Sequence, residues 1–226
     1  MKICVLIPSY NESKAISSLV KRIKAEGLDI LVVDDGSIDS TAEAAELAGA
    51  CVLRNEQNKG KGASLKEGFR HILRKDYDAV ITMDGDSQHS PDDISKFIAE
   101  ATNPDVDMII GNRMSFNKDM PFVRRLTNYS MSTLISLICR RNIPDSQCGF
   151  RLIKRNVLEK LNPISSNYEI ESETIIDAHR KGFKIKFIPV QTIYAKQVSQ
   201  INPFVDTIRF FRFLFIKAFS SFFNKR

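Results

Sequence analysis

The chain has 226 residues, 43% of them hydrophobic, so it can bury one substantial core and is neither a low-complexity nor a disordered sequence. Its net charge of +6 is unevenly distributed: residues 1–111 carry 13 Lys/Arg against 19 Asp/Glu, and residues 112–226 carry 20 against 8. A basic second half favours phosphates, nucleic acid or an anionic membrane as partners. The apolar run at 3–7 is too short for a secretory signal and ends at Pro8, so we expect a cytoplasmic location.

Short apolar runs alternate with amphipathic stretches through the first half of the chain. Runs typical of buried strands cover 2–7, 28–34, 50–53, 79–83 and 106–110. Helices are predicted from about residue 9 or 11 to 26, over 41–48, from about 58 to 75, and from near Pro91 onward. This alternation predicts an α/β protein with a mostly parallel sheet and helices on both faces. Cys4 and Cys51 lie in apolar runs and are expected to be reduced, buried thiols.

The pattern changes after Gly111. Residues 122–140 form a long, mostly apolar helical segment with arginines at its ends, and residues 183–194 alternate with period two like a half-exposed strand. The sequence shows no internal repeat and no linker long enough to separate two domains.

The final stretch, 203–226, holds eight of the fifteen phenylalanines and five basic residues. Most of its phenylalanines recur every three or four residues, which predicts an amphipathic helix. Spanning a bilayer takes about 20 predominantly apolar residues, and Arg209, Arg212 and Lys217 interrupt this run. We therefore expect an interfacial helix, with its basic face toward anionic headgroups. The alternative is a helix docked on the protein's own core or at a dimer interface.

Two carboxylates, Asp84 and Asp86, follow the apolar run that begins at Ala79. We expect them just beyond the carboxyl end of a buried strand, which is where ligands bind in open α/β sheets. Paired hard oxygen ligands favour Mg²⁺ or Mn²⁺, and such ions usually bridge to substrate phosphates. The sequence therefore predicts a site for a metal ion and a diphosphate. A solvated polar turn is the alternative.

Six short motifs follow one another along the chain: 7–12 (IPSYNE), 33–37 (VDDGS), 58–62 (NKGKG), 84–89 (DGDSQH), 111–113 (GNR) and 145–151 (DSQCGFR). In this order they resemble the family 2 glycosyltransferases of GT-A fold. The last motif resembles the polyprenyl-phosphate branch, which includes dolichyl-phosphate mannose synthase and dolichyl-phosphate glucosyltransferase. The resemblance implies a GT-A (Rossmann-like) domain over 1–202, with a nucleotide-sugar-binding half at 1–111 and an acceptor half at 112–202, followed by a membrane-associating segment at 203–226.

For the donor, the resemblance implies a nucleotide pocket lined by Pro8, Tyr10, Glu12 and Asp35. Asp35 stands at the end of a strand and can accept hydrogen bonds from a nucleoside, while Glu12 can take a ribose hydroxyl. A first-turn carboxylate that favours the helix dipole is the alternative for Glu12. Lys61, which stands between two glycines, adds positive charge near a diphosphate.

For the metal, the resemblance implies that Asp84 contacts both donor and ion. Asp86 and Gln88 match metal-binding positions in the mannose synthases. His89 is either a turn residue or a further ligand.

A lipid monophosphate acceptor is already anionic, so it needs cations to hold it and no base to activate it. Arg113, Arg124 and Arg151 match family positions and are the candidates for contacting the acceptor phosphate and the diphosphate. Arg124 has the Arg-x-x-x-Asn spacing with Asn128, and its neighbour Arg125 is the alternative.

Three further residues are expected on the substrate side. Asp145 orients either Arg151 or the acceptor, and Gln147 belongs to a segment that favours the glucosyltransferase-like relatives. Ser199 matches the serine of a mobile acceptor loop in the family.

We therefore expect an inverting, metal-dependent hexosyltransferase that uses a donor of the UDP-glucose or GDP-mannose type and a polyprenyl phosphate. It would attach peripherally to the cytoplasmic face of the membrane. One alternative is a family 2 glycosyltransferase with a saccharide acceptor, for which Glu171 or Glu173 would be the base. Another is a non-catalytic nucleotide-sugar-binding protein. A nucleic-acid binder would leave the paired acids at the strand ends unexplained.

Overall fold

The computed structural model describes residues 1–116, 120–193, 209–210 and 212–214. The chain divides into two compact units, Met1–Tyr194 and Ala195–Arg226. In the second unit the described residues are helical, and the rings of Phe210 and Phe213 lie 6.3 Å apart. Ser199 and most of the predicted interfacial helix 203–226 therefore lie outside the described residues.

The first unit contains a single sheet and the helices that connect its strands. The strands are β1 (Ile3–Ser9), β2 (Asp29–Asp34), β3 (Cys51–Arg54), β4 (Ala79–Thr82), β5 (Met108–Asn112), β6 (Arg151–Lys154) and β7 (Ile185–Pro189). The helices are α1 (Ser13–Ala25), α2 (Thr41–Ala48), α3 (Lys61–Leu73), α4 (Ile94–Ala101), α5 (Phe122–Cys139), α6 (Arg155–Leu158) and α7 (Glu169–Arg180), with 3-10 turns η1 (Pro91–Asp93) and η2 (Arg113–Phe116).

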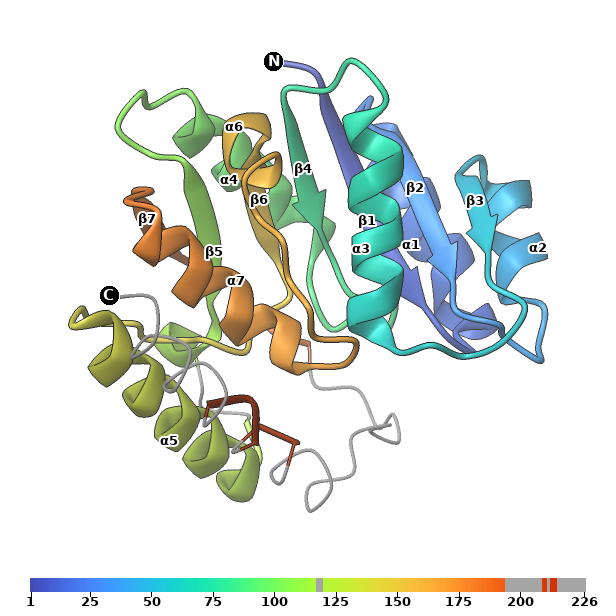
Figure 1. Cartoon of the computed structure of the whole chain (residues 1–226). Helices are drawn as coiled ribbons and strands as arrows, with labels where there is room; N and C mark the ends of the chain where they lie inside the picture. The colour runs from blue at the N-terminus through green and yellow to red at the C-terminus, as the bar shows by residue number, and fades with distance from the viewer. Residues whose placement is uncertain (117–119, 194–208, 211, 215–226) are drawn as a thin grey trace. The chain divides into compact units, whose positions relative to one another are not determined.

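The seven strands lie in the order β3-β2-β1-β4-β6-β5-β7. Neighbouring strands are parallel except at β6, which runs antiparallel to both β4 and β5. Helices α3, α6 and α7 cover the face turned to the viewer in Figure 1, and α1 and α4 cover the other, with α2 packed beside α1. The predicted α/β architecture is confirmed. Strand β6 was not predicted, because its four residues make too short an apolar run to stand out.

The core lies between the sheet and these two helical layers. All seven residues of β1 are buried, as expected for a strand covered on both faces. Behind the sheet, Phe97 of α4 stacks on Phe150 with ring centroids 4.2 Å apart. Helix α1 turns one apolar stripe inward, formed by Ile16, Leu19, Val20 and Ile23.

Some predicted details differ from the structure. Strand β1 continues through Pro8, because it pairs with β2 as far as Ser9 opposite Asp34, so α1 begins only at Ser13. Cys4 is buried, but Cys51 lies on the edge strand β3 and is exposed, so the prediction of a buried thiol there was wrong. Of the predicted strand 183–194, the structure pairs residues 185–189 with β5.

One edge of the sheet gathers the sequence motifs. The carboxyl ends of the parallel strands β1, β2, β4 and β5 meet at this edge, the lower one in Figure 1. Strand β6 runs the other way and begins at the same edge, with Arg151 opposite Thr82 of β4. The motifs at 7–12, 33–37, 84–89, 111–113 and 145–151 therefore meet there.

Within the described ranges, no helix combines the length and the apolar character that crossing a bilayer requires.

Candidate active site

Asp84 lies just beyond β4, at the centre of a charged cluster. Its Oδ1 is 2.5 Å from Nζ of Lys61 at the start of α3, and the same ammonium is 2.6 Å from Oε1 of Glu171 in the first turn of α7. Burial opposes ionisation of Asp84, but Lys61, His89 and Arg113 outweigh it and lower the pKa of Asp84 to about 2. Burial also opposes the charge on Lys61, but Asp84 and Glu171 raise its pKa above the usual value. Both groups are therefore charged at neutral pH.

The two acids considered as bases, Glu171 and Glu173, occupy different surroundings. Glu173 is fully buried, and its Oε2 accepts hydrogen bonds from the backbone amides of Ile164 at 3.1 Å and Ser165 at 2.9 Å. It therefore fixes the loop that enters α7. The carboxylate of Glu171 instead joins Lys61 at the site. Of the two acids, Glu171 is the one that can take part in chemistry at Asp84.

Gly149 supports Asp84 from the chain that enters β6. The hydroxyl of Thr82 donates to the carbonyl of Gly149 at 2.7 Å and holds this chain against the end of β4. A Cβ at residue 149 would lie 2.7 Å from Oδ2 and 2.8 Å from Oδ1 of Asp84. Only a residue without a side chain lets the backbone approach the carboxylate this closely.

Negative charge accumulates next to Asp84. Burial, followed by the charges of Asp86, Asp39 and Asp84, raises the pKa of Glu12 to about 7. Burial and the charge of Asp84 likewise raise the pKa of Asp86, and the nearby cation Arg124 acts against this rise. The acids at the ends of β1 and β4 thus share one region of negative potential, which a cation would relieve.

This donor set fits a hard divalent cation. Asp84 and Asp86 offer carboxylate oxygens, the ligands that Mg²⁺ and Mn²⁺ prefer. Across the part of the chain that the structure describes, no group of three or more His, Cys, Asp or Glu side chains forms a closed metal cage. Sites with one or two carboxylates complete their coordination with water and substrate phosphates. Gln88 shapes this turn through its backbone, whose amide donates to Oδ1 of Asp86 at 3.0 Å.

His89 is buried behind the acidic turn. Burial is the main cause that lowers its pKa to about 4, and the charge of Arg113 adds to the effect. Its Nε2 lies 3.8 Å from Oδ2 of Asp84, and its ring packs on Phe150 with centroids 5.3 Å apart. A backbone bridge joins His89 to Thr192. The imidazole is therefore neutral and braces the turn that carries Asp84.

The predicted donor-side residues come together at the ends of β1 and β2. Pro8 is buried within β1, and half-buried Tyr10 and Glu12 follow it. The amide of Asp35 donates to the carbonyl of Ser9 at 2.8 Å, so the two strand ends lie side by side. Glu12 precedes α1 but makes no side-chain capping hydrogen bond with it.

Asp35 organises the loop between β3 and α3. Its Oδ1 accepts hydrogen bonds from the side-chain amide of Asn55 at 2.8 Å and the backbone amide of Lys59 at 3.1 Å. Its Oδ2 accepts from the amide of Gly60 at 2.8 Å. The carboxylate thereby fixes the wall of the expected nucleotide pocket.

The backbone of the loop that enters α7 packs against the glycine motif at 58–62. Gly60 has φ +95, and a Cβ there would clash with the carbonyl of Ser166. The amide of Ala63 donates to that same carbonyl at 3.1 Å. The loop that enters α7 therefore rests on the start of α3 and sets the distance between Lys61 and Glu171.

Asp145 pairs with Arg113. The Oδ2 of Asp145 accepts from Nε of Arg113 at 2.8 Å, and Oδ1 accepts from Nη2 at 2.9 Å. Both side chains are almost completely buried, and Arg113 helps to hold the pKa of Asp145 below its usual value against the effect of burial. The amide of Gln147 also donates to Asp145 at 3.1 Å, and its side chain donates to the hydroxyl of Ser172 at 2.8 Å.

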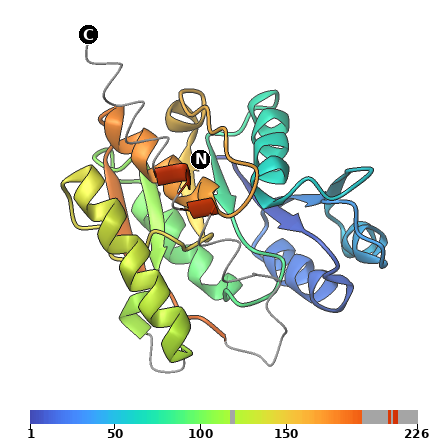
Figure 2. The same ribbon diagram turned by 60° about the horizontal axis from the view of Figure 1, so that its bottom comes forward.

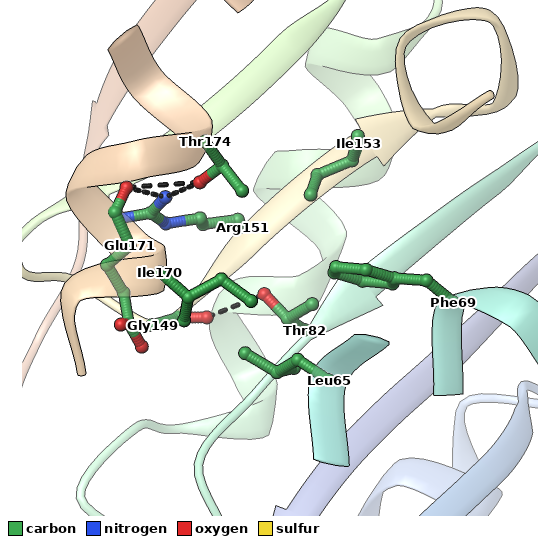
Figure 3. Close-up of a pocket in the computed structure, with 9 residues that line it drawn as sticks. All are labelled: Leu65, Phe69, Thr82, Gly149, Arg151, Ile153, Ile170, Glu171 and Thr174. Atoms are coloured by element: carbon green, nitrogen blue, oxygen red, sulfur yellow. Dashed lines mark hydrogen bonds between the residues drawn. The ribbon is translucent and has the colours of Figure 1, made fainter. Parts of the chain in front are cut away.

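Arg151 lies beneath α7, as Figure 3 shows. Its guanidinium donates to the carbonyls of Cys148 at 2.7 Å, Ser146 at 3.0 Å and Glu171 at 2.6 Å, and to the hydroxyl of Thr174 at 2.7 Å. The carboxylate of Glu171 points away from this guanidinium. Arg151 therefore ties the entry of β6 to the first turn of α7. The gap that it adjoins is lined by Leu65, Phe69, Thr82, Gly149, Arg151, Ile153, Ile170, Glu171 and Thr174.

Helix α5 places its two neighbouring arginines differently. The charge of Arg124 acts on Asp86, and Asn128, one turn further on, is buried. The guanidinium of Arg125 instead lies 5.5 Å from the centre of the Phe122 ring. Arg124 is thus the arginine on the side of the acidic pair.

With this geometry in hand, comparison with known proteins identifies the family. Residues 4–162 match the family described as Glycosyl transferase family 2. The chain belongs to this family. Its membership confirms the resemblance seen in the motifs and shows that the chain is a glycosyltransferase, against the alternative of a non-catalytic binding protein.

Relatives of this family 2 glycosyltransferase include enzymes named for lipid phosphates. UDP-N-acetylglucosamine–dolichyl-phosphate N-acetylglucosaminyltransferase of Methanococcus voltae is 30% identical over an alignment that covers 95% of this chain and 96% of the relative. Polyprenol monophosphomannose synthase of Mycolicibacterium smegmatis is 31% identical over 82% of this chain and 75% of the relative. These names agree with the polyprenyl-phosphate branch predicted from residues 145–151.

A solved structure supports the fold. Glucosyl-3-phosphoglycerate synthase from Mycobacterium tuberculosis, in complex with Mn²⁺ and UDP-glucose, matches with a TM-score of 0.70 and 21% identity over 87% of this chain and 72% of that chain. The likeness confirms the GT-A architecture of this family 2 glycosyltransferase. It also shows divalent metal use in an enzyme of the same fold.

The close approach of Gly149 to Asp84 leads to a first prediction, about the rate of glycosyl transfer. In Gly149→Ala the new methyl group would displace the Asp84 carboxylate, and misplacement by about 1 Å at a reacting centre costs roughly 100-fold in rate. We expect glycosyl transfer to fall by about that factor. Thermal melting of the same preparation is the control for folding. A variant that keeps the wild-type rate would contradict this role of Gly149.

The raised pKa of Glu12 leads to a second prediction, about how stability depends on pH. Because the pKa rises from an ordinary value of 4.5 to about 7 in the fold, the ionised form is disfavoured in the native state, and stability declines as pH rises between these values. In the metal-free protein, Glu12→Gln should therefore be more stabilising, relative to wild type, at pH 8 than at pH 5. Urea unfolding at both pH values measures the difference, with Glu46→Gln on α2 as the exposed control. An equal difference in the free energy of unfolding between variant and wild type at both pH values would contradict the raised pKa of Glu12.

Proposed function

We propose that this glycosyltransferase moves one hexose from a nucleoside diphosphate donor, of the UDP-glucose or GDP-mannose type, to a polyprenyl phosphate, with inversion at the sugar. The observation that carries the proposal is one sheet edge where the acidic pair Asp84 and Asp86 meets the cations Lys61, Arg113 and Arg124. The dolichyl and polyprenyl phosphates named in its relatives support the choice of acceptor.

For the donor, we assign Pro8, Tyr10, Glu12 and Asp35 to the nucleoside and Lys61 to the diphosphate. The first four residues stand at the adjacent ends of β1 and β2, and Asp35 already fixes the loop that leads to Lys61. The charge of Lys61 and its place at the start of α3 favour a phosphate.

For the metal, we assign Asp84, Asp86 and Gln88 to Mg²⁺ or Mn²⁺. The bound cation would supply positive charge that stabilises the departing diphosphate. Gly149 lets Asp84 keep the position that this role requires.

The transfer step follows from the charge of the acceptor. A phosphate oxygen attacks the anomeric carbon while the bond from that carbon to the donor diphosphate breaks on the opposite face, and the electron pair leaves with the nucleoside diphosphate. The attacking oxygen carries no proton that must be removed. Arg113, oriented by Asp145, and Arg124, with Asn128, would hold the acceptor phosphate through charge-assisted hydrogen bonds.

The remaining assigned residues act around this step. Arg151 supports the site through its bonds to the entry of β6 and to α7. Gln147 belongs to the same entry segment as Asp145. The role of Ser199 in an acceptor loop stays a prediction.

A saccharide acceptor is the second candidate, and one observation favours it. Glu171 is a buried carboxylate at the site, and its Oε1 lies 2.6 Å from the ammonium of Lys61. A sugar hydroxyl would need such a base. Its engagement with Lys61 supports the lipid phosphate instead.

The outer face of α5 also supports a lipid acceptor. Phe122, Leu126 and Tyr129 share one face of the helix and are 67%, 54% and 65% exposed. The same helix carries Arg124 on the side of the site and packs beside α7, as Figure 2 shows. An apolar face next to an anion-binding group fits a lipid phosphate at a membrane surface. We infer peripheral attachment to the cytoplasmic face of the membrane.

A transfer assay tests the function. With Mn²⁺ and radiolabelled UDP-glucose, GDP-mannose or UDP-N-acetylglucosamine, label should enter the organic phase when dolichyl or undecaprenyl phosphate is present. EDTA should abolish transfer, and Asp84→Asn with Asp86→Asn should lower it by roughly 100- to 1,000-fold, as loss of charge stabilisation at a reacting oxygen does. Transfer that survives EDTA would reject the metal-dependent mechanism. Label that enters a saccharide, with near-complete loss in Glu171→Gln, would favour the second candidate.

The exposed face of α5 makes a separate prediction. Leu126→Gln with Tyr129→Gln should weaken co-sedimentation with anionic liposomes by at least about tenfold, because burying even one such side chain contributes roughly 1.5–3 kcal/mol. Leu47→Gln is the matched control, since Leu47 is 89% exposed on α2. Equal liposome binding by the α5 variant and the control would exclude this face from membrane contact.

A further inference from the structure

Lys61 stands between two carboxylates in nearly enclosed surroundings. Its Nζ lies 2.5 Å from Asp84, 2.6 Å from Glu171 and 5.7 Å from the centre of the Tyr168 ring. The side chain of Lys61 is 17% exposed and that of Glu171 is 5% exposed. Ion pairs shielded from water in this way are stronger than pairs on the surface.

The contact with Asp84 engages an oxygen that a metal ion would also need. Oδ1 of Asp84 faces Lys61, and Oδ2 lies 3.8 Å from the neutral imidazole of His89. Gly149 closes off the carboxylate from the side of β6. A cation that already neutralises a carboxylate reduces its attraction for a second cation. Lys61 and a divalent ion therefore compete for Asp84.

We propose that Lys61 is a built-in counter-cation of Asp84, which weakens the binding of a free divalent ion until a donor diphosphate draws the ammonium away. This inference rests on the proposed function. Glu171 is the positioning residue: it keeps the ammonium beside the site when Asp84 turns to the metal. Metal and nucleotide then bind together, and a metal ion without nucleotide binds weakly.

The geometry permits this exchange of partners. An ammonium on a flexible four-carbon stem has three donors, so it can turn from a carboxylate to a phosphate without movement of the helix. Lys61 is the first residue of α3, where the helix N-terminus adds to the attraction for phosphate. A diphosphate also carries more negative charge than the single carboxylate of Asp84, so it can take the ammonium.

The test measures Mn²⁺ binding by electron paramagnetic resonance, without any sugar transfer. In the absence of nucleotide, Lys61→Met should bind Mn²⁺ at least about fivefold more tightly than wild type, the lower end of typical couplings between sites. With UDP or GDP present this advantage should vanish or reverse, because the diphosphate has lost its ammonium partner. Lys66→Met is the matched control, since Lys66 lies on the same helix and its ammonium contacts the carbonyl of Ile164 at 3.0 Å.

A second comparison covers the case in which Lys61→Met leaves Glu171 unpaired and fails to fold. The double variant Lys61→Met with Glu171→Gln removes both buried charges, and it should bind nucleotide-free Mn²⁺ at least about fivefold more tightly than Glu171→Gln alone. The pair of variants also tests Glu171. Glu171→Gln should weaken Mn²⁺ binding more in the presence of Lys61 than in its absence, because without Glu171 the ammonium rests on Asp84 alone. A purely structural tether between α3 and α7 predicts no such difference.

The outcomes separate this inference from the proposed function. If wild type binds Mn²⁺ with UDP or GDP but removal of Lys61 leaves nucleotide-free binding unchanged or weaker, the counter-cation is rejected and the metal-dependent transferase stands. If wild type binds no Mn²⁺ even with nucleotide, both are rejected.

Discussion

The site depends on how the charge of Asp84 is balanced. A carboxylate that follows a buried strand loses hydration and needs an opposite charge to stay ionised. Here that charge comes from Lys61 at the start of α3, and Lys61 in turn is shared with Glu171 in α7. One ammonium thus connects the end of a strand to two helices that are far apart in sequence. The same charged groups suit the binding of a diphosphate and its metal ion. The ion pairs that stabilise the fold are therefore also the groups that the chemistry requires.

Strand β6 completes this arrangement because it runs against its neighbours. An antiparallel strand begins where β4 ends, so its entry segment delivers Gly149 to Asp84 and Asp145 to Arg113. A parallel strand in the same place would bring its opposite end to this edge. The direction of four residues therefore decides which side chains meet at the acidic turn.

Local patterns were enough to predict where the acids would gather, because Asp35, Asp84 and Asp86 follow parallel strands whose carboxyl ends lie at one edge of the sheet. They could not predict partners that lie far apart in the chain. Asp145 was assigned to Arg151 or the acceptor, yet the fold pairs it with Arg113. Glu171 and Glu173 resembled each other in sequence, and only the path of the loop entering α7 separates them. Strand β6 was too short to give a periodic signal.

The position of β6 has a consequence for how such enzymes can diversify. It comes from the second half of the chain, yet it lies between β4 and β5 of the first half. Recombination that exchanged one half for that of a relative would have to preserve the register that sets Thr82 opposite Arg151. Without it, two strand edges would face each other across a gap with their backbone groups unpaired. An exchange of halves between relatives therefore requires a strand that matches β6 in length and register.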